Sequence, residues 1–190
     1  MRPFLTLRKF LLQDWDACLD IGSGDGVFTQ LMHNNGRHVI EIDINPHSST
    51  VVSCDYQVCN FATQFDAIWC SHVLEHQLNV NSFLTKIHKD LKEGGWLAIT
   101  VPPMKPNIVG GHLTIWNAGL LLYNLILAGF DCRDAMVKTY DYNVSVVVQS
   151  KHIKLPKLKY DSGDIETLSE YFPLDIAKQD FNGDIKEINW

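Results

Sequence analysis

The sequence predicts an α/β protein built on a doubly wound, mostly parallel sheet that carries an antiparallel strand near one edge. Short apolar runs alternate with segments of helical periodicity, which is the order expected when helices connect parallel strands. A glycine-rich segment directly follows the first apolar run, as in the ligand-binding turns of such sheets. The last two runs are joined by only a few residues, too few for a parallel crossover, so that pair is expected to be antiparallel.

Seven apolar runs account for the predicted strands. Each is short, and glycine, proline or asparagine follows several of them, which is typical of strands that end in turns. The runs cover residues 17–21, 38–44, 51–53, 67–70, 96–101, 135–139 and 144–149. The mixed sheet is therefore expected to have seven strands, with a turn at residues 141–143 between the last two.

The helical segments lie between these runs. Residues 80–91 form the clearest one, because apolar side chains line one face and lysines lie elsewhere. The pair Gly94-Gly95 is expected to end this helix. Apolar spacing also predicts helices at residues 25–33 and 117–127.

The 190 residues fit one domain, and 46% hydrophobic residues are enough for a buried core. We expect residues 1–150 to form the ligand-binding core. Residues 151–190 are more polar, include a short predicted helix at 164–172 and are too few for a second domain. Phe172 and Trp190 predict that this tail packs on the core.

Charge and hydropathy narrow the partners and the location. The net charge of −6 repels phosphate backbones and disfavours nucleic acid as a partner. The longest apolar stretch, residues 118–128, is far shorter than the roughly 20 residues that span a bilayer. Arg8 and Lys9 interrupt the N-terminal apolar residues and no cleavage site follows. We therefore expect no secretion signal, no membrane span and a cytoplasmic protein.

The five cysteines are an odd number, and several lie in apolar runs. This usage is typical of reduced, buried thiols in a cytosolic protein. No C-x-x-C pair is present, so a structural zinc site has no support, and the sequence predicts no metal ligands.

The clearest functional motif is the loop Asp20-Ile21-Gly22-Ser23-Gly24-Asp25-Gly26, between the first predicted strand and the first helix. Its glycines allow a tight turn and the close approach of a ligand. A dinucleotide fingerprint needs G-x-G-x-x-G, whereas this loop is G-x-G-x-G, and the phosphate-loop pattern is absent. The carboxylate of Asp20 suits a cationic ligand better than a pyrophosphate, which it would repel.

Further acidic positions complete the predicted ligand site. Asp43 lies 21 residues after Gly22, at the end of the second strand, where a carboxylate can accept hydrogen bonds from both ribose hydroxyls. Asp55 and Tyr56 follow the third strand, and this pair can meet an adenine ring with a hydrogen-bond acceptor and an aromatic edge. These residues favour a ligand with a ribose, an adenine and a positive charge.

Four motifs, in this order and at this spacing, resemble those of class I S-adenosylmethionine-dependent methyltransferases, and the resemblance covers about residues 17–150. They are L-D-I-G-S-G-D-G (19–26), I-D-I-N-P (42–46), F-D-A-I-W-C-S-H-V-L-E-H (65–76) and L-K-E-G-G-W-L-A-I-T-V-P (91–102). The resemblance implies a Rossmann-like fold, S-adenosylmethionine as cofactor and methyl transfer as the activity (EC 2.1.1.-).

The resemblance also implies a role for each part of the site. The glycine loop would hold the methionine portion of the cofactor, and the end of the second strand would hold the ribose and the adenine face. The residues after the third strand would lie at the adenine edge, and those ending the fourth strand beneath the sulfonium. In the same order, the implied cofactor-binding residues are Asp20, Gly22, Ser23, Gly24, Gly26, Asp43, Ile44, Asp55, Tyr56, Cys70 and Ser71.

The segment His72-Val73-Leu74-Glu75-His76 also fits H-x-x-E-H, the zinc pattern of inverted metallopeptidases. That chemistry needs both histidines on one face of a long helix and a third ligand from elsewhere. Here the motif follows a strand, and residues 77–81 indicate a loop before the next helix. We therefore expect Glu75 and His76 to support the loop by hydrogen bonds rather than to bind zinc.

Methyl transfer to an alcohol requires the acceptor oxygen to lose its proton, and a histidine within hydrogen-bond distance can take it. His72 and His76 follow the fourth strand, and His112 follows the fifth, after two glycines. All three are expected at the ligand end of the sheet. His112 is the preferred catalytic base, because the glycines free its loop and a separate loop can face the acceptor.

Motifs that the sequence lacks restrict the chemical class of the methyl acceptor. No [DNS]-P-P-[YFW] tetrad follows the fourth strand and no Pro-Cys pair occurs, which disfavours methylation of DNA bases. Residues 102–117 and 151–190 are expected to recognise the acceptor, and the latter resemble short bacterial methyltransferases of surface-glycan clusters. We therefore predict O-methylation of a small molecule or glycan. N- or carboxyl methylation of a metabolite, and a non-catalytic domain that binds the cofactor or a partner chain, as in a homodimer, stay open.

Overall fold

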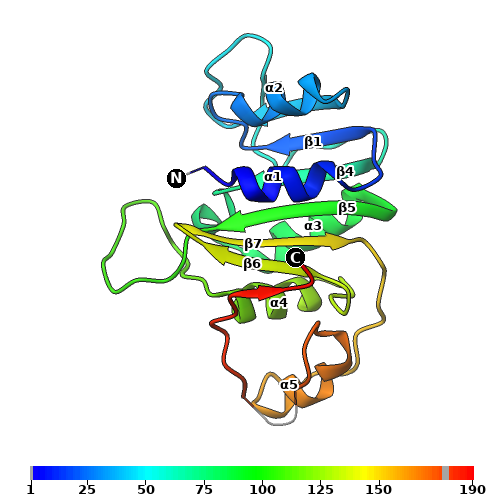
Figure 1. Cartoon of the computed structure of the whole chain (residues 1–190), viewed down its shortest axis with the longest axis vertical. Helices are drawn as coiled ribbons and strands as arrows, with labels where there is room; N and C mark the ends of the chain where they lie inside the picture. The colour runs from blue at the N-terminus through cyan, green and yellow to red at the C-terminus, as the bar shows by residue number, and fades with distance from the viewer. Residues whose placement is uncertain (1, 177–179) are drawn as a thin grey trace.

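One mixed sheet of eight strands lies between two layers of helices (Figure 1). The structure, a computed structural model, describes residues 2–176 and 180–190. The strand order is β3-β2-β1-β4-β5-β7-β6-β8. The strands are β1 (Ala17–Ile21), β2 (His38–Asp43), β3 (Val52–Ser53), β4 (Phe65–Ser71), β5 (Leu91–Val101), β6 (Met136–Tyr140), β7 (Asn143–Gln149) and β8 (Glu187–Ile188).

Helices cover both faces of this sheet, as the alternation of strands and helices predicts. One layer contains α1 and α2, and the other contains α3 and α4 (Figure 1). Short helices complete the connections after β4 and in the C-terminal segment. The helices are α1 (Phe4–Leu11), α2 (Val27–Asn34), η1 (Leu74–His76), α3 (Val80–Asp90), α4 (Ala118–Leu127), α5 (Gly163–Thr167) and η2 (Ser169–Tyr171).

The parallel strands end at one edge of the sheet. Ile21, the last residue of β1, lies opposite Ile42 of β2 on one side and Cys70 of β4 on the other. From β1 the chain continues to β2 and β3 on one side of β1, and it then crosses to β4 on the other side. This is a topological switch point, and the carboxyl edge of the sheet at such a point is where ligands bind in α/β proteins.

The antiparallel part of the sheet is larger than predicted. β7 pairs antiparallel with β5 and β6, as expected, and the two-residue turn Asp141-Tyr142 joins β6 to β7. An eighth strand, β8, pairs with β6 and corrects the predicted count of seven. β8 has only two residues in a polar segment, so it has no hydrophobic periodicity by which the sequence could reveal it.

The helix predicted over residues 80–91 ends earlier than expected. α3 ends at Asp90, and Leu91 already begins β5. The pair Gly94-Gly95 lies inside β5, where the pairing with β4 shifts register. A Cβ at residue 95 would come within 2.9 Å of the carbonyl oxygen of Asp66, so the glycine allows the two strands to approach there.

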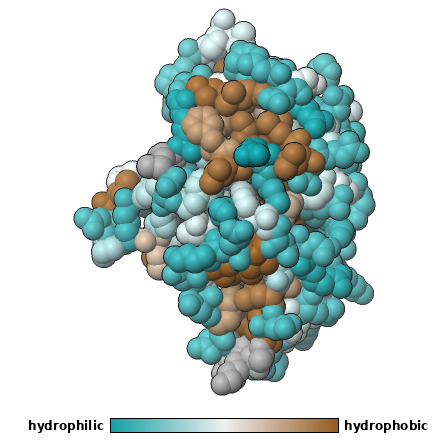
Figure 2. All heavy atoms as spheres, viewed as in Figure 1, coloured by the Kyte–Doolittle hydropathy of each residue, from teal (hydrophilic) through white to brown (hydrophobic). Residues whose placement is uncertain are grey.

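The two faces of the sheet bury separate apolar clusters. α3 and α4 pack over the larger cluster, and α1 and α2 pack over a smaller one that contains Phe10 and Trp69. The Thr6 hydroxyl bonds to the hydroxyls of Tyr140 and Ser145 and anchors α1 on the sheet. The single N-terminal helix thus covers a sheet face rather than the carboxyl edge. Figure 2 shows that apolar side chains also gather on the outer surface of this half of the molecule.

Residues after β7 return to the core. Leu168, Phe172 and Ile185 are buried in the larger cluster, and the segment predicted as one helix at 164–172 forms α5 followed by η2. The backbone N–H of Gly119 at the start of α4 donates to the carbonyl of Gly183 at 3.0 Å. A Cβ on Gly119 would lie 2.6 Å from the Gly183 Cα, so the contact needs glycine.

Three of the five cysteines are free thiols and the other two are paired. Cys18, Cys70 and Cys132 are buried free thiols, as predicted. The structure pairs Cys54 with Cys59 in a disulfide, which departs from the prediction that all five cysteines are reduced and buried. Within residues 2–176 and 180–190, every helix falls short of the length and apolar character needed to cross a membrane.

Candidate active site

A cavity of about 300 Å³ opens at the carboxyl edge of the sheet, between the ends of β1, β2 and β4. Residues that are far apart in the sequence meet there, because the three strands end at the same level. Seven of the predicted site residues line it, together with six others. The lining consists of Ile21, Gly22, Ile42, Asp43, Ile44, Cys54, Asp55, Tyr56, His72, Val73, His76, Gln77 and Phe83.

The glycine loop is shaped by a neighbouring side chain. Gly22 has a φ of +71°, and a Cβ at this position would lie 2.4 Å from Cγ2 of Val73. The backbone N–H groups of Gly22 and Ser23 both donate to the carbonyl of Ile42, which ties the loop to β2. The side chain of Ser23 is buried, and its Oγ lacks a hydrogen-bond partner among the described residues. Ser23 itself does not line the cavity, and the left-handed backbone of the preceding Gly22 favours glycine.

Gly26 directly precedes α2 and is in the left-handed conformation, with a φ of +72°. A Cβ there would lie 3.1 Å from the Oε2 atom of Glu41, so this glycine gives room to β2. The residues implied to bind the cofactor that stay outside the cavity lining are Asp20, Ser23, Gly24, Gly26, Cys70 and Ser71. Gly24 and Gly26 act on the shape of the loop.

Asp43 is held at the cavity by the backbone. Its Oδ2 accepts from the N–H of Gly24 at 2.9 Å, and its Oδ1 accepts from the N–H of Asn45 at 2.8 Å. These two bonds orient the carboxylate before any ligand binds. The next residue, Ile44, is 65% exposed and lines the same cavity, so an apolar surface lies beside the carboxylate.

Asp20 lies beneath the loop rather than in the cavity. Its side chain is 1% exposed, and its Oδ2 accepts from the hydroxyl of Thr29 at 2.7 Å. Burial raises the pKa of Asp20 to about 7, and the negative charges of Glu41 and Asp43 add to this rise, while the bond from Thr29 opposes it. Asp20 can therefore act on a ligand through its charge but makes no wall of the cavity.

The residues after β3 form the opposite wall. Asp55 is exposed at the cavity rim, whereas Tyr56 is buried and its hydroxyl donates to Oδ2 of Asp90 at 2.8 Å. Burial, together with the Asp90 carboxylate, raises the pKa of Tyr56 above its usual value. The Tyr56 hydroxyl is thus occupied inside the core, and only its ring contributes to the cavity.

Cys70 and Ser71, two predicted cofactor-binding residues at the end of β4, do not line the cavity. Cys70 is buried in the larger core cluster, and burial raises the pKa of its thiol well above the usual value. Ser71, which is half-buried, follows it at the end of the strand. The lining at this point comes instead from His72 and Val73.

His72 is held by two side chains from different elements. Its Nε2–H donates to Oδ1 of Asn143 at 3.0 Å, and its Nδ1 lies 3.3 Å from Oε1 of Glu75. Burial alone would lower the pKa of His72, but the hydrogen bonds to Glu75 and Asn143 outweigh it and raise the pKa above its usual value. The ring stacks on Tyr142, whose β6–β7 turn sequence reasoning did not connect with this site.

His76 and His112 meet at the border of the cavity. The Nδ1–H of His76 donates to the carbonyl of Gly111 at 2.7 Å, and the ring centroids of the two histidines are 5.1 Å apart. The carbonyl of Glu75 accepts from the N–H of Leu113 at 2.7 Å. The loop after β5 is therefore joined to η1, as expected from the supporting role predicted for Glu75 and His76.

The H-x-x-E-H segment does not form the helix that a metallopeptidase needs. His72 directly follows β4 and has a φ of +57°, and η1 is a single turn over Leu74–His76. The two histidines of the motif consequently approach Glu75 from different elements. The structure rules out the peptidase arrangement, although Glu75, His76 and His112 each place a ligand atom within 4.8 Å of the others.

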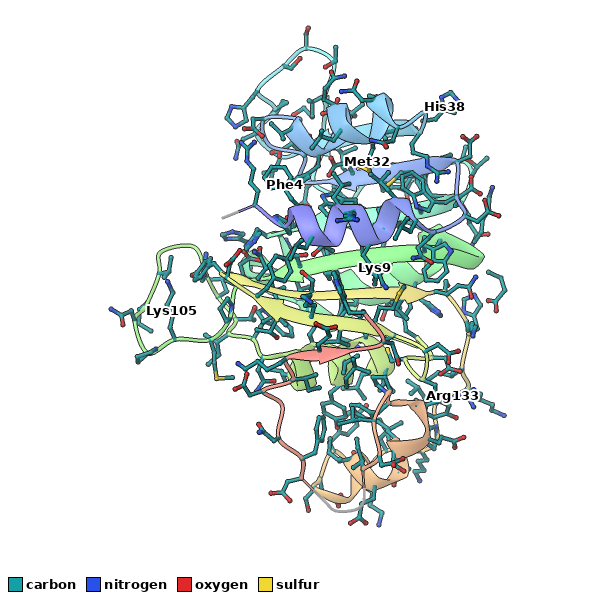
Figure 3. The ribbon with its side chains drawn as sticks, in the orientation of Figure 1. Phe4, Lys9, Met32, His38, Lys105 and Arg133 are labelled. Atoms are coloured by element: carbon teal, nitrogen blue, oxygen red, sulfur yellow. A yellow bond between two sulfur atoms is a disulfide. The ribbon has the colours of Figure 1, made fainter. Side chains whose placement is uncertain are left out.

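A second, smaller cavity of about 40 Å³ lies under the loop after β5. His112 lines it, and Lys105 lies with its Nζ 4.3 Å from the ring centroid of Tyr142 (Figure 3). The loop projects from the sheet edge (Figure 1) and exposes apolar side chains, among them Ile108 at 94%. The histidines thus separate a larger cavity, walled by Gly22 and by residues at the ends of β2 and β4, from a smaller one with an apolar rim.

Known proteins resemble this chain in sequence. A family model described as "Methyltransferase domain" matches residues 4–123. The human mitochondrial ubiquinone biosynthesis O-methyltransferase is 32% identical over 101 residues, which cover 43% of this chain and 27% of that protein. The matched region thus spans about a quarter of the curated relative.

Solved structures agree over most of the chain. The Burkholderia thailandensis 1,6-didemethyltoxoflavin-N1-methyltransferase, solved with 1,6-didemethyltoxoflavin and S-adenosylhomocysteine, has a TM-score of 0.64 and 19% identity, covering 77% of this chain and 76% of that one. A SAM-dependent methyltransferase from Archaeoglobus fulgidus has a TM-score of 0.64 and 18% identity, covering 78% and 94%. At this identity the likeness concerns the fold.

Proposed function

The chain belongs to the methyltransferase-domain family and its cofactor is S-adenosylmethionine, and from this premise we propose that it methylates a hydroxyl of a small molecule or glycan. The observation that carries the proposal is the row of histidines between the two cavities. A hydroxyl acceptor must lose a proton, and His72, His76 and His112 supply bases on that border. The human relative, an O-methyltransferase, supports oxygen as the acceptor atom.

The residues of the larger cavity fit this cofactor. Asp43, oriented by two backbone N–H groups, would accept from the ribose hydroxyls, and the exposed side chain of Ile44 would pack on the adenine. The buried Oγ of Ser23, without a partner among the described residues, would bind the methionine portion. The volume of about 300 Å³ lies within the range of small-molecule sites.

Two other implied residues would act indirectly. The carboxylate of Asp20 lies under the loop and would contribute negative charge near the sulfonium and the ammonium of the cofactor. The hydroxyl of Tyr56 donates to Asp90, so Tyr56 would limit the cavity by its ring and leave hydrogen bonding at the adenine edge to Asp55.

When bound, the sulfonium supplies an electrophilic methyl group that is already activated. The chain must then place the acceptor oxygen in line with that methyl, exclude water and remove the hydroxyl proton. His112 is the preferred proton acceptor, because it lines the smaller cavity and its ring makes no hydrogen bond among the described residues. In His76 and His72 the nitrogen that is left to accept a proton lies beside Oε1 of Glu75, at 3.9 Å and 3.3 Å, rather than toward the smaller cavity.

Recognition of the acceptor would come from the loop after β5. The smaller cavity, of about 40 Å³, has room for no more than a small group, so the acceptor would place its hydroxyl near His112 and rest an apolar part on the exposed side chains of this loop. We also propose that residues 1–150 act as the cofactor-binding core and that residues 151–190 complete it.

The experiment has two stages. Calorimetric titration with S-adenosylmethionine and S-adenosylhomocysteine, with NAD as the control, should show saturable binding of the first two alone. Turnover is then followed by S-adenosylhomocysteine release over a panel of phenols, sugars, nucleotide sugars, amines and carboxylates, and the product is identified by mass and carbon NMR. Methyl ethers support the proposal. Methylation of amines or carboxylates alone would refute it in favour of the alternatives, as would cofactor binding without any turnover.

A further inference from the structure

We propose that Glu75, His76 and His112 form a binding site for a divalent metal ion, with Zn²⁺ as the best match, at the border of the two cavities. One ligand atom from each of the three lies within 4.8 Å of the others. The proposal departs from the sequence expectation of no metal ligands. The metal's part in catalysis rests on the proposed O-methylation, whereas its binding can be measured independently.

The first observation is a buried carboxylate with a free oxygen. The side chain of Glu75 is 1% exposed, and its Oε2 has no hydrogen-bond partner among the described residues. Its Oε1 lies near His72 and, at 3.9 Å, near Nε2 of His76, and within the described part of the chain no lysine or arginine pairs with it. Burial of a carboxylate without a permanent cation is costly, and a bound metal ion would offset that cost.

The second observation is the orientation of His76. Because the carbonyl of Gly111 accepts from Nδ1–H at 2.7 Å, the neutral ring carries its lone pair on Nε2, the nitrogen that faces Glu75. Histidines that bind metals in proteins characteristically donate their other ring N–H to a carbonyl or carboxylate, which fixes the tautomer. His76 is thus held in the form that a metal ligand requires.

The third observation concerns the loop that carries His112. Gly111 has a φ of +82°, and a Cβ there would lie 3.3 Å from Nδ1 of His76. Together with the bond from the N–H of Leu113 to the carbonyl of Glu75, this glycine lets the loop bring His112 beside His76. The third ligand comes from 36 residues further along the chain, so the H-x-x-E-H pattern could not have included it.

The donor set indicates the metal. Two imidazoles and one carboxylate favour Zn²⁺ or a related late first-row ion over Mg²⁺ and Ca²⁺, which prefer oxygen ligands. Three protein ligands leave a coordination position open, as in catalytic rather than structural zinc sites. His72 does not belong to this group of three, and its Nδ1, which lies 3.3 Å from Oε1 of Glu75, would orient that carboxylate instead.

His76 lines the larger cavity and His112 the smaller one, and their rings are in contact, so an ion held by both would lie where the two sets of lining residues meet. A hydroxyl bound there would have a lowered pKa and would release its proton to water. The O–CH3 bond then forms as the S–CH3 bond breaks, and the electron pair of the broken bond stays on sulfur, which becomes a neutral thioether. In this arrangement the metal ion replaces a free His112 imidazole in activating the acceptor.

The test uses the purified full chain, freed of metal by dialysis against a chelator. Zn²⁺ is titrated in competition with a chromophoric chelator, and Co²⁺ reports the coordination by its visible absorption. We expect saturable binding of one ion per chain. Glu75→Gln and His112→Ala should each weaken Zn²⁺ binding at least tenfold. His38→Ala is the matched control, since His38 is exposed and far from the Lys105 loop (Figure 3).

Each outcome decides one question. Absence of saturable Zn²⁺ binding, or equal binding by the wild type and both variants, overturns the metal site. Binding of S-adenosylhomocysteine by the same metal-free protein tests the cofactor separately, so either proposal can fail while the other stands. Thermal unfolding of each variant reports folding, and His112→Ala keeps the test decisive should Glu75→Gln fail to fold, because His112 is only half-buried in a loop.

Discussion

The two sides of the site are built in different ways. The side that we propose for the cofactor depends on backbone conformation: Gly22 and Gly24 adopt positive φ, and backbone N–H groups orient Asp43. All of these residues lie within one β-loop-α-β unit. The side that we propose for the acceptor depends on side chains from separate segments, because His76 after β4 is in contact with His112 after β5.

Because of this difference, substitutions on the two sides of the site should have different effects on folding stability and on turnover. A substitution on the cofactor side changes the path of the backbone and should alter both folding and cofactor affinity. A substitution at His112, which lines only the smaller cavity, removes chemistry from a frame that other residues hold, so it should alter turnover and leave cofactor affinity unchanged. The predictions below test this separation, beginning with the largest expected effect.

His112→Ala should reduce turnover on the acceptor by about 10²–10⁴-fold, because it removes either the proton acceptor or a ligand of the proposed metal site. The affinity for S-adenosylhomocysteine and the unfolding free energy should stay unchanged, since the ring makes no hydrogen bond among the described residues. Steady-state kinetics and calorimetry measure the two quantities. Unchanged turnover would show that His112 has no part in the reaction.

Gly22→Ala should lower the unfolding free energy by about 2–3 kcal/mol, because the new Cβ would meet Cγ2 of Val73 and the backbone φ disfavours any side chain. Cofactor affinity should fall with it. Gly24→Ala is the matched control: its φ is also positive, but no atom lies within 4 Å of the new Cβ, so about 1 kcal/mol is expected.

Urea unfolding of both variants gives the comparison, and a double variant sharpens it. Val73→Ala removes the clashing Cγ2 atom and should recover part of the loss caused by Gly22→Ala. Equal losses in Gly22→Ala and Gly24→Ala would mean that the contact with Val73 does not constrain the loop.

Asp43→Asn should weaken S-adenosylhomocysteine binding by about 2 kcal/mol, roughly thirtyfold, because charge-assisted bonds to the ribose are lost. Asp55→Asn, at the exposed rim of the same cavity, should weaken binding much less. Calorimetric titration of both variants decides between them. An equal loss in the two would place the ribose nearer Asp55 than we propose.

The smallest expected effect concerns the contribution of Asp20 to the pH dependence of the unfolding free energy. Its pKa is raised to about 7 in the folded chain, chiefly by burial, against an ordinary value of 3.8. The folded state therefore holds the proton more tightly than the unfolded state, and stability due to this group falls as the pH rises from about 4 to about 7. Above that range the contribution is constant.

Asp20→Asn should remove this slope, because the amide oxygen can still accept from Thr29 without carrying charge. Urea unfolding at pH 5 and pH 7.5 should show that the variant gains on the wild type at the higher pH, by on the order of 1 kcal/mol. A difference that is independent of pH would mean that Asp20 is not neutral in the folded chain at pH 5.

Much of the fold follows from local sequence. The predicted strands 17–21 and 51–53 agree with β1 and β3 within one residue, because buried parallel strands appear as short apolar runs between turn residues. Gly94-Gly95 was misplaced because a glycine pair signals an interruption without saying whether a helix or a strand is interrupted. β8 carries no periodic signal, since its two residues are recruited only by pairing with β6.

The candidate site, like the fold, could be predicted from the sequence only in part. The glycine loop and Asp43 could be recognised from sequence, because spacing along one β-loop-α-β unit determines their positions at the sheet edge. The occupied hydroxyl of Tyr56 and the place of Asp20 beneath the loop could not, because both depend on partners that packing brings in.

The sequence by itself determined the sheet, its carboxyl-edge site and the family, because these depend on periodicity and on short motifs whose residues are neighbours in the chain. Only the tertiary structure decided that His112 meets His76, that Asn143 holds His72 and that Glu75 is buried with a free oxygen. Those contacts join segments separated by tens of residues. Their geometry is set by the packing of the loop after β5 against η1 and the β6–β7 turn, which no local pattern records.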